Sequence, residues 1–179
     1  KGIEYVIKAL PEIIEQNLSR TIKYFILGRT HPNKPLEYLH YLQGLAEKLG
    51  VQDNVIFRSE YLEIEDILQY LVNSNLYVTP YYRREQSSSG TLSYAIGCGR
   101  PVVSTPYVFA SDLINIYKVG ELINFRDETS TARTISSLIQ SPEKLRKYEK
   151  NALELSRKIF WSKVVEQFLD LFSKISKEK

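Results

Sequence analysis

Residues 76–104 read LYVTPYYRREQSSSGTLSYAIGCGRPVVS, and this stretch decides the fold. It begins with a short apolar run that stops at Pro80 and ends with the apolar run PVVS, and both runs are typical of buried strands. Between them, residues 87–98 carry small and apolar side chains in a pattern that predicts a helix. A strand, a helix and a second strand in this order form a right-handed crossover, which places the two strands parallel in one sheet.

The same alternation continues on both sides of this stretch. Apolar patterns predict strands over residues 22–27, 54–58, 76–79, 101–104 and 121–124. Helical spacing predicts helices over residues 2–16, 35–49, 63–72, 87–98, 111–117, 129–140, 142–157 and 161–174. Pro11 predicts a kink or a second helical segment within the first of them. We therefore expect the α/β class, with a Rossmann-like, doubly wound, mostly parallel sheet and a helical C-terminus.

The order of the elements indicates a part of a larger protein. A free-standing domain of this class normally begins with a central strand, whereas the first element expected here is a helix. The chain also contains no methionine, not even at position 1. We expect residues 1–179 to form a single domain of a longer protein, with the first strand absent.

The composition excludes several classes of protein. Apolar residues make up 43% of the 179 residues, which suffices for one substantial core, and no run approaches the roughly 18–20 apolar residues of a membrane span. Because Cys98 is the one cysteine, neither a disulfide scaffold nor a zinc module is expected. A net charge of +3, spread among acidic residues, does not indicate nucleic-acid binding. We expect a cytoplasmic domain, and the basic tail over residues 174–179 is a weak candidate for contact with an anionic membrane.

Three loops are candidate binding segments, because ligands of doubly wound sheets bind beyond the carboxyl ends of the strands. The first begins with Gly28, Arg29 and Thr30, where the glycine opens the backbone to a ligand and the guanidinium can fork onto phosphate. The richest loop covers residues 81–91, where the start of a helix presents backbone N–H groups beside serine and threonine hydroxyls, which suits a diphosphate. The third covers residues 104–107. Plain turns and an ordinary serine N-cap are the alternatives.

Motifs for several other chemistries are missing. No Gly-Lys-Ser/Thr follows a glycine-rich loop, and the three spaced glycines of a dinucleotide site are absent, which argues against ATPases and dinucleotide oxidoreductases. His31 and His40 have no nucleophile and acid at a readable spacing, and we expect His40 to be structural. No Asp-x-Asp pair offers ligands for a metal that bridges a diphosphate, so we expect neither metal nor cofactor.

Five blocks together resemble the C-terminal domain of GT-B glycosyltransferases of family four. The blocks are Lys1-Gly2, FILG at residues 25–28, NVIF at residues 54–57, VTPY at residues 78–81 and QSSSGTLSYAIGCGRPVV at residues 86–103. The run GCGRPVVSTPY is the most specific part, and the resemblance covers nearly the whole chain.

The resemblance implies the C-terminal half of a GT-B fold. In that family this domain binds a nucleotide-diphosphate sugar, and an N-terminal domain of the same protein binds the acceptor. The implied activity is transfer of a hexose with retention, and the isolated piece would be inactive. Lys1 is similar to the lysine that contacts the donor diphosphate. Such a charge stabilises a departing nucleoside diphosphate without metal.

The family carries two glutamates separated by seven residues, and this chain replaces both. Aligning on residues 99–101 places Gln86 at the first position, near the donor sugar, and Tyr94 at the second, near the ribose. Gln86 can still bond sugar hydroxyls, whereas Tyr94 accepts ribose hydroxyls less well than a carboxylate does. Glu85 and Ser93 have the same spacing, but using them requires a shift of one residue just before the best-matched run.

The resemblance also assigns the remaining donor-binding residues. Ser88, Ser89, Gly90 and Thr91 correspond to the stretch whose backbone amides face the donor sugar and phosphate. The segment with Ser59 and Tyr61 corresponds to the one that contacts the base, and Tyr61 is expected either to stack on the base or to cover the edge of the sheet. Gly28, Arg29 and Thr30 lie in the first of the expected donor loops.

Two other functions compete with a glycosyltransferase. One is a binding or scaffold module that kept the fold and lost the donor site, which the missing glutamates favour. The other is a GT-B sugar-nucleotide epimerase, which would require carboxylates and histidine in the donor site. The last helix has an apolar face that includes Trp161 and Phe168, and this face is expected to pack either across the two domains of the family or inside this domain.

Overall fold

The computed structural model describes residues 1–29 and 36–177, and it confirms the α/β class. Its strands are β1 (Tyr24–Leu27), β2 (Val55–Arg58), β3 (Tyr77–Thr79), β4 (Val102–Ser104) and β5 (Gly120–Leu122). Every strand pair is parallel, as the crossovers require. The strands form two groups, β1-β2 and β3-β4-β5, rather than the one continuous sheet that we expected. Within the described residues, β1 pairs with β2 alone and β3 with β4 alone, so no hydrogen-bonded strand joins the two groups.

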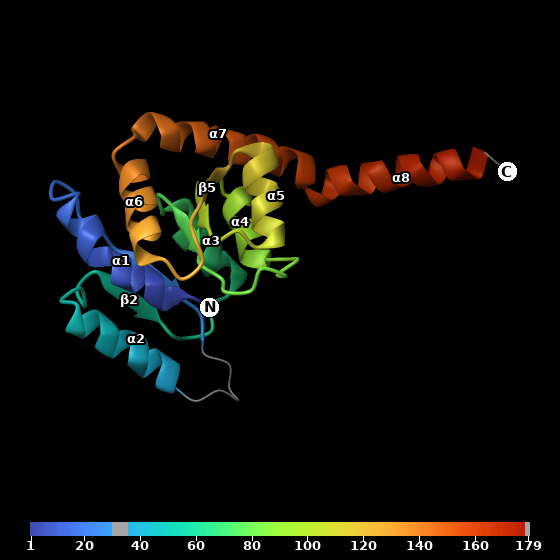
Figure 1. Ribbon diagram of the computed structural model, residues 1–179. Coiled ribbons are helices and arrows are strands. Elements are labelled where there is room, and N and C mark those ends of the chain that lie inside the picture. Colours follow the sequence, from blue (N-terminus) through green and yellow to red (C-terminus); the bar gives the residue numbers. More distant parts are fainter. Residues whose placement is uncertain (30–35, 178–179) are drawn as a thin grey trace.

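Helices surround both groups of strands, as Figure 1 shows. They are α1 (Ile3–Glu15), α2 (Glu37–Lys48), α3 (Ile64–Val72), α4 (Gly90–Gly97), α5 (Val108–Tyr117), α6 (Glu128–Ile139), α7 (Pro142–Ile159) and α8 (Trp161–Lys177). All the predicted helices and strands are present, with ends that shift by up to three residues. Pro11 lies inside α1, which continues to Glu15 as a single helix, so the second helical segment is not formed.

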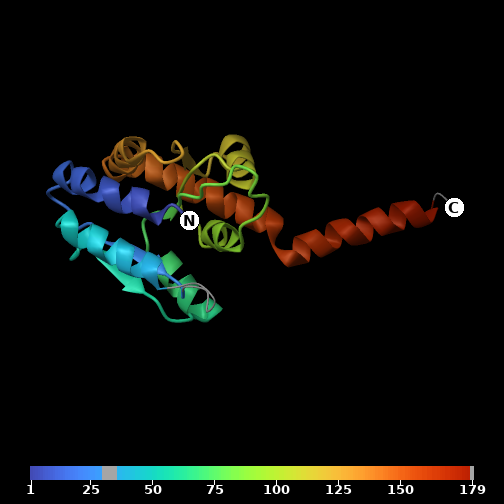
Figure 2. The ribbon, with the colours of Figure 1, turned by 60° about the horizontal axis from the view of Figure 1, so that its bottom comes forward.

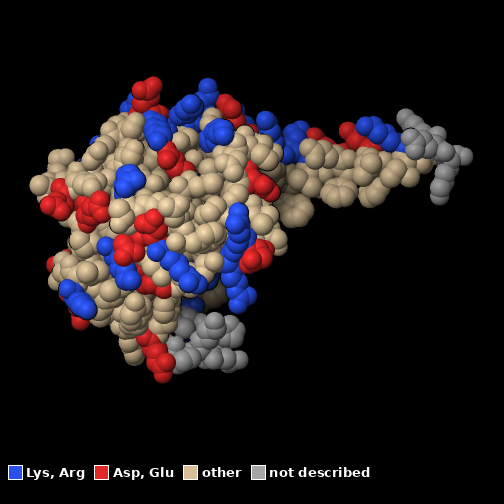
Figure 3. All heavy atoms as spheres, in the orientation of Figure 1, with Lys and Arg blue, Asp and Glu red and all other residues tan. Residues whose placement is uncertain are grey.

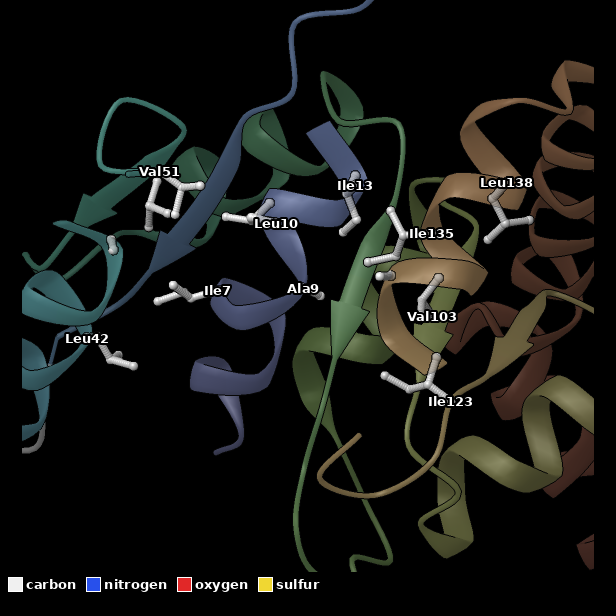
Figure 4. Packing of buried hydrophobic residues seen from close by; sticks show 13 residues of the cluster. Ile7, Ala9, Leu10, Ile13, Leu42, Val51, Val103, Ile123, Ile135 and Leu138 are labelled. Carbon is white, nitrogen blue, oxygen red and sulfur yellow. The ribbon is translucent and has the colours of Figure 1, made fainter. Parts of the chain in front are cut away.

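One hydrophobic core joins the two groups of strands through α1. Helix α1 buries a stripe of apolar residues and packs against both α6 and α2. Figure 4 shows Ile7 of α1 on the side of Leu42 of α2 and Ile13 of α1 on the side of Ile135 of α6. The same cluster includes Val103 of β4, so the sheets share a core although they are not hydrogen-bonded to each other.

Gly2 fixes the start of α1 against the end of β3. Its φ of 84° lies in the left-handed region, which a residue with a Cβ rarely adopts. A Cβ built on Gly2 would lie 1.8 Å from the carbonyl oxygen of Pro80. Only a glycine lets these two backbones approach so closely, and the approach brings Lys1 beside the loop that follows β3.

Helix α4 starts three residues later than its pattern predicts. Ser89 has extended backbone angles, and its hydroxyl oxygen accepts the N–H of Leu92 at 3.4 Å, so Ser89 is the N-cap and Gly90 the first helical residue. Leu92 and Ile96 are buried. The chain leaves the helix at Gly99, whose φ is 70°.

Helix α8 projects from the end of α7, away from the rest of the domain, in both ribbon views (Figures 1 and 2). Trp161 is 83% exposed, and Phe168 and Phe172 are more than half exposed. The expectation that this face packs inside the domain is therefore wrong. Figure 3 shows charged side chains along one edge of α8 and an uncharged surface along the other. No helix in residues 1–29 and 36–177 is long and apolar enough to cross a membrane.

Candidate functional site

The loop between β3 and α4, residues 80–89, is held by hydrogen bonds to its neighbours. Helix α5 begins against it, because the N–H groups of Val108 and Phe109 donate to the carbonyls of Arg84 at 2.9 Å and Gln86 at 3.3 Å. These bonds satisfy N–H groups that the first turn of a helix leaves without a partner, and they explain why α5 starts three residues earlier than predicted. The hydroxyl of Thr105 donates to the carbonyl of Tyr81 at 2.7 Å. The loop therefore presents its side chains from a fixed backbone.

The start of α4 combines backbone N–H groups with hydroxyls. Ser89 is buried, whereas Ser88, Gly90 and Thr91 are exposed. The hydroxyl oxygens of Thr91 and Tyr77 are 2.7 Å apart, which connects the first turn of α4 to β3. A helix N-terminus with donors of this kind favours an anionic group, and it lies beyond the carboxyl end of a parallel strand, where doubly wound folds bind ligands.

Lys1 reaches the same place from the other end of the chain. Its ammonium lies 5.1 Å from the centroid of the Tyr81 ring. Burial opposes ionisation of the Tyr81 phenol, but hydrogen bonds with Ser89 and Thr91 and the charge of Lys1 outweigh it, so the pKa of Tyr81 falls below its usual value. Tyr81 thus touches the groups that the sequence assigned to phosphate binding.

Glu4 connects Tyr82, the residue after Tyr81, to α1 and α2. Its carboxylate accepts the hydroxyl of Tyr38 on α2 at 2.6 Å and also that of Tyr82. Partial burial opposes ionisation of Glu4, but these two hydroxyl donors prevail and the pKa of Glu4 is lowered. The same carboxylate raises the pKa of Tyr82 to about 12, with burial as the larger cause. The guanidinium of Arg126 lies 5.6 Å from the Tyr82 ring centroid.

The two residues at the family's glutamate positions have different surroundings. The Gln86 amide donates to the carbonyl of Ser88 at 2.7 Å, so Gln86 is held beside the start of α4 with its amide oxygen as an acceptor. Tyr94 lies one turn further along α4 and is 39% exposed. Gln86 therefore lies at the start of α4, whereas Tyr94 lies within that helix.

The other predicted donor-binding residues lie on the β1-β2 side. Gly28 has a φ of 107°, and its N–H donates to the carbonyl of Arg58 at 2.9 Å. Arg29 is exposed, and Thr30 lies outside the described residues, as does His31. Ser59 is half-buried after β2, and Tyr61 is 74% exposed, so it does not cover the edge of the sheet.

Two further features of the described chain bear on the site. His40 is exposed on α2, so the expectation that it is a structural residue among apolar neighbours is wrong. An open hollow of about 380 Å³ lies along α7, lined by charged residues such as Arg146 and Glu149, and shares no residue with the site. Within residues 1–29 and 36–177, no three His, Cys, Asp or Glu side chains gather as a metal site would require.

Parallel strands with flanking helices, and hydroxyl and N–H groups beyond the end of β3, define a doubly wound α/β domain. More particularly, the chain belongs to the glycosyl transferases group 1, because the sequence model of that family matches residues 1–155.

The chain is similar to parts of longer glycosyltransferases. It is 25% identical over 176 residues to an uncharacterised glycosyltransferase of Methanocaldococcus jannaschii, covering 98% of this chain and 42% of that protein. It is 29% identical over 144 residues to the lipopolysaccharide glucosyltransferase WaaG of Escherichia coli, covering 79% of this chain and 35% of that protein. The chain thus spans less than half the length of either relative.

A solved structure supports the fold independently. The crystal structure of Anabaena HepE in complex with UDP superposes with a TM-score of 0.80 at 20% identity, covering 99% of this chain and 45% of that one. This likeness places the chain in a GT-B architecture and confirms the expectation of half a GT-B fold.

Among the residues that build the site around the loop after β3, sequence reasoning missed three: Glu4, Tyr81 and Tyr82. The signal for the two tyrosines was present, because they directly follow Pro80 at the carboxyl end of β3. Nothing in the local pattern marked Glu4, whose partners Tyr38 and Tyr82 are 34 and 78 residues away.

Proposed function

We propose that this chain is the donor-binding part of a glycosyltransferase and that it binds a nucleotide-diphosphate sugar with the diphosphate at the N-terminus of α4. One observation carries the proposal. Lys1, Tyr81 and the hydroxyl-bearing first turn of α4 converge at the carboxyl end of β3, although Lys1 is 80 residues from Tyr81 in the sequence.

The chemistry of this cluster suits the departure of a nucleoside diphosphate. Negative charge develops on the diphosphate as the bond to the sugar breaks. The ammonium of Lys1 and the N–H groups at the start of α4 stabilise that charge because they are already in place before the reaction. Gln86 offers its amide oxygen to a hydroxyl of the donor sugar. We propose transfer with retention and without a metal, as the family resemblance implies.

The remaining groups of the reaction lie outside this chain in the proposal. The relatives are more than twice as long, and an acceptor domain in the rest of the protein would complete the site. The chain alone is therefore proposed to bind nucleotide without turnover. Lipopolysaccharide appears in the name of one relative, and UDP is bound in one solved structure. For this chain we propose a nucleoside diphosphate whose base is either a purine or a pyrimidine.

Isothermal titration of the chain with UDP, GDP, ADP and CMP tests the proposal. We expect binding of one nucleoside diphosphate, and we expect Lys1→Ala to weaken it by about tenfold or more, since a charge-assisted contact is lost. Lys163→Ala, which removes an exposed lysine on α8, is the matched control and should leave binding unchanged. Absence of binding to all four nucleotides would instead favour the scaffold module that lost its donor site, which Gln86 and Tyr94 in place of glutamates would then explain.

A further inference from the structure

Holding the side chain of Lys1 in one position requires favourable contacts. A lysine side chain loses up to about 2 kcal/mol of rotamer entropy when it is ordered. Here its ammonium lies 5.1 Å from the centroid of the Tyr81 ring, within the range of a cation–π interaction. The face of that ring therefore limits the positions open to the charge.

Tyr81 is itself a fixed platform. Its ring packs against the fully buried ring of Tyr107, with centroids 5.1 Å apart. Its carbonyl accepts the Thr105 hydroxyl at 2.7 Å. Its own hydroxyl bonds with Ser89 and Thr91, the N-cap and the second residue of α4. Tyr81 thus contacts both Lys1 and the start of α4.

The neighbouring tyrosine shows that this arrangement is particular to Tyr81. Tyr82 turns to the carboxylate of Glu4 and to the guanidinium of Arg126. Its ring meets Tyr5 edge-on, with centroids 6.3 Å apart. Of these two adjacent tyrosines, Tyr81 serves the start of α4 and Tyr82 anchors the loop to α1.

We propose that Tyr81 is a positioning residue, which holds the ammonium of Lys1 beside the N-terminus of α4 so that a bound diphosphate meets a charge already in place. The inference rests on the proposed function and names a residue that determines how well the site binds its anion. Tyr81 contacts Lys1 both through the face of its ring and through its hydroxyl.

A double-mutant cycle with UDP as the probe tests this inference. We expect Tyr81→Leu in the whole chain to weaken UDP binding about three- to thirtyfold, the size of a cation–π contribution. We expect Lys1→Ala to weaken it as well, and the variant with both changes to bind no more weakly than Lys1→Ala, because the ring acts through the lysine. Tyr81→Phe keeps the ring but removes the hydroxyl, so its affinity should lie between those of the original chain and of Tyr81→Leu. Tyr117→Leu, at the far end of α5, is the control and should bind as the original chain does.

Additive effects of Lys1→Ala and Tyr81→Leu would overturn the inference while UDP binding, and with it the proposed function, still stands. A second measurement needs no ligand and no change in the core. Lys1→Ala should raise the pKa of Tyr81, followed by NMR of tyrosine-labelled chain, because the nearby charge is lost. An unchanged pKa would overturn the inference whether or not the chain binds UDP.

Discussion

The loop after β3 and residues 28–29, the described start of the loop after β1, lie at equivalent positions, at the carboxyl ends of parallel strands, and they differ in the contacts that hold them. The backbone of the loop after β3 contacts α5 and Thr105, and its side chains contact Glu4, Lys1 and α4. The described start of the other loop exposes both Gly28 and Arg29. The topology of the sheet therefore offers several places for a ligand, and long-range contacts preorganise the loop after β3.

We expect the largest loss of stability from a change that separates the loop after β3 from the start of the chain. Gly2→Ala places a Cβ against the Pro80 carbonyl at a left-handed φ, and we expect a loss of about 2–5 kcal/mol in the free energy of unfolding. Gly44→Ala is the control, because a Cβ there meets nothing within 4 Å on α2 and should stabilise by about 0.5–1 kcal/mol. Urea denaturation measures both. Equal effects of the two changes would contradict the account.

Removing the charge of Glu4 should loosen the same loop in a way that depends on pH. We expect Glu4→Gln to destabilise the chain by about 1–2 kcal/mol near neutral pH, because the hydroxyls of Tyr38 and Tyr82 lose a charged acceptor. The folded-state pKa of Glu4 is the lowered one. Its stabilisation is therefore complete above the ordinary glutamate pKa of about 4.3 and is lost as the pH falls through the folded value.

Denaturant titrations of the original chain and of Glu4→Gln from about pH 3 to 7 measure this effect. The two curves should converge at the acidic end. A difference that stays constant with pH would show that the charge of Glu4 does not anchor the loop.

The cap of α4 is a smaller element of the same region. Ser89→Ala removes the oxygen that accepts the Leu92 N–H, and we expect a loss of about 1 kcal/mol in the free energy of unfolding. Ser88→Ala changes the exposed residue just before it and should alter stability by less than about 0.5 kcal/mol. Thermal denaturation monitored by circular dichroism compares them, and a larger loss from Ser88→Ala would show that the cap is misassigned.

The smallest effect is expected in the loop after β1. Arg29 is exposed, so Arg29→Ala should change the free energy of unfolding by less than about 0.5 kcal/mol. The same denaturation experiment measures it. A loss comparable with that of Gly2→Ala would remove the contrast between the two loops.

Local patterns predicted the elements of this fold and much of the loop after β3. The strand that ends at Pro80 and the serines before α4 were sufficient to predict an anion site there, and the structure places Lys1 beside Tyr81 of that loop. The pattern also predicted the helix of residues 161–174, but a helical period does not say what covers its apolar face. The exposure of Trp161 could therefore not be predicted from the local pattern.

The rest depended on contacts between distant residues. The division of the strands into two groups follows from which strands are neighbours, and apolar runs do not encode that. The roles of Glu4 and Tyr81 likewise depend on distant partners, because Tyr38 and Tyr82 lie 34 and 78 residues from Glu4 and Lys1 lies 80 residues from Tyr81. A single sequence shows residue types and spacing, whereas these contacts need the fold.

Amide hydrogen exchange of the whole chain, with and without UDP, tests the central claim most directly. The account predicts that UDP slows exchange at residues 88–92, the start of α4, and leaves α8 unchanged, because the bound diphosphate protects the N–H groups that it accepts from. Slower exchange confined to other segments, or no change at the start of α4, would contradict it.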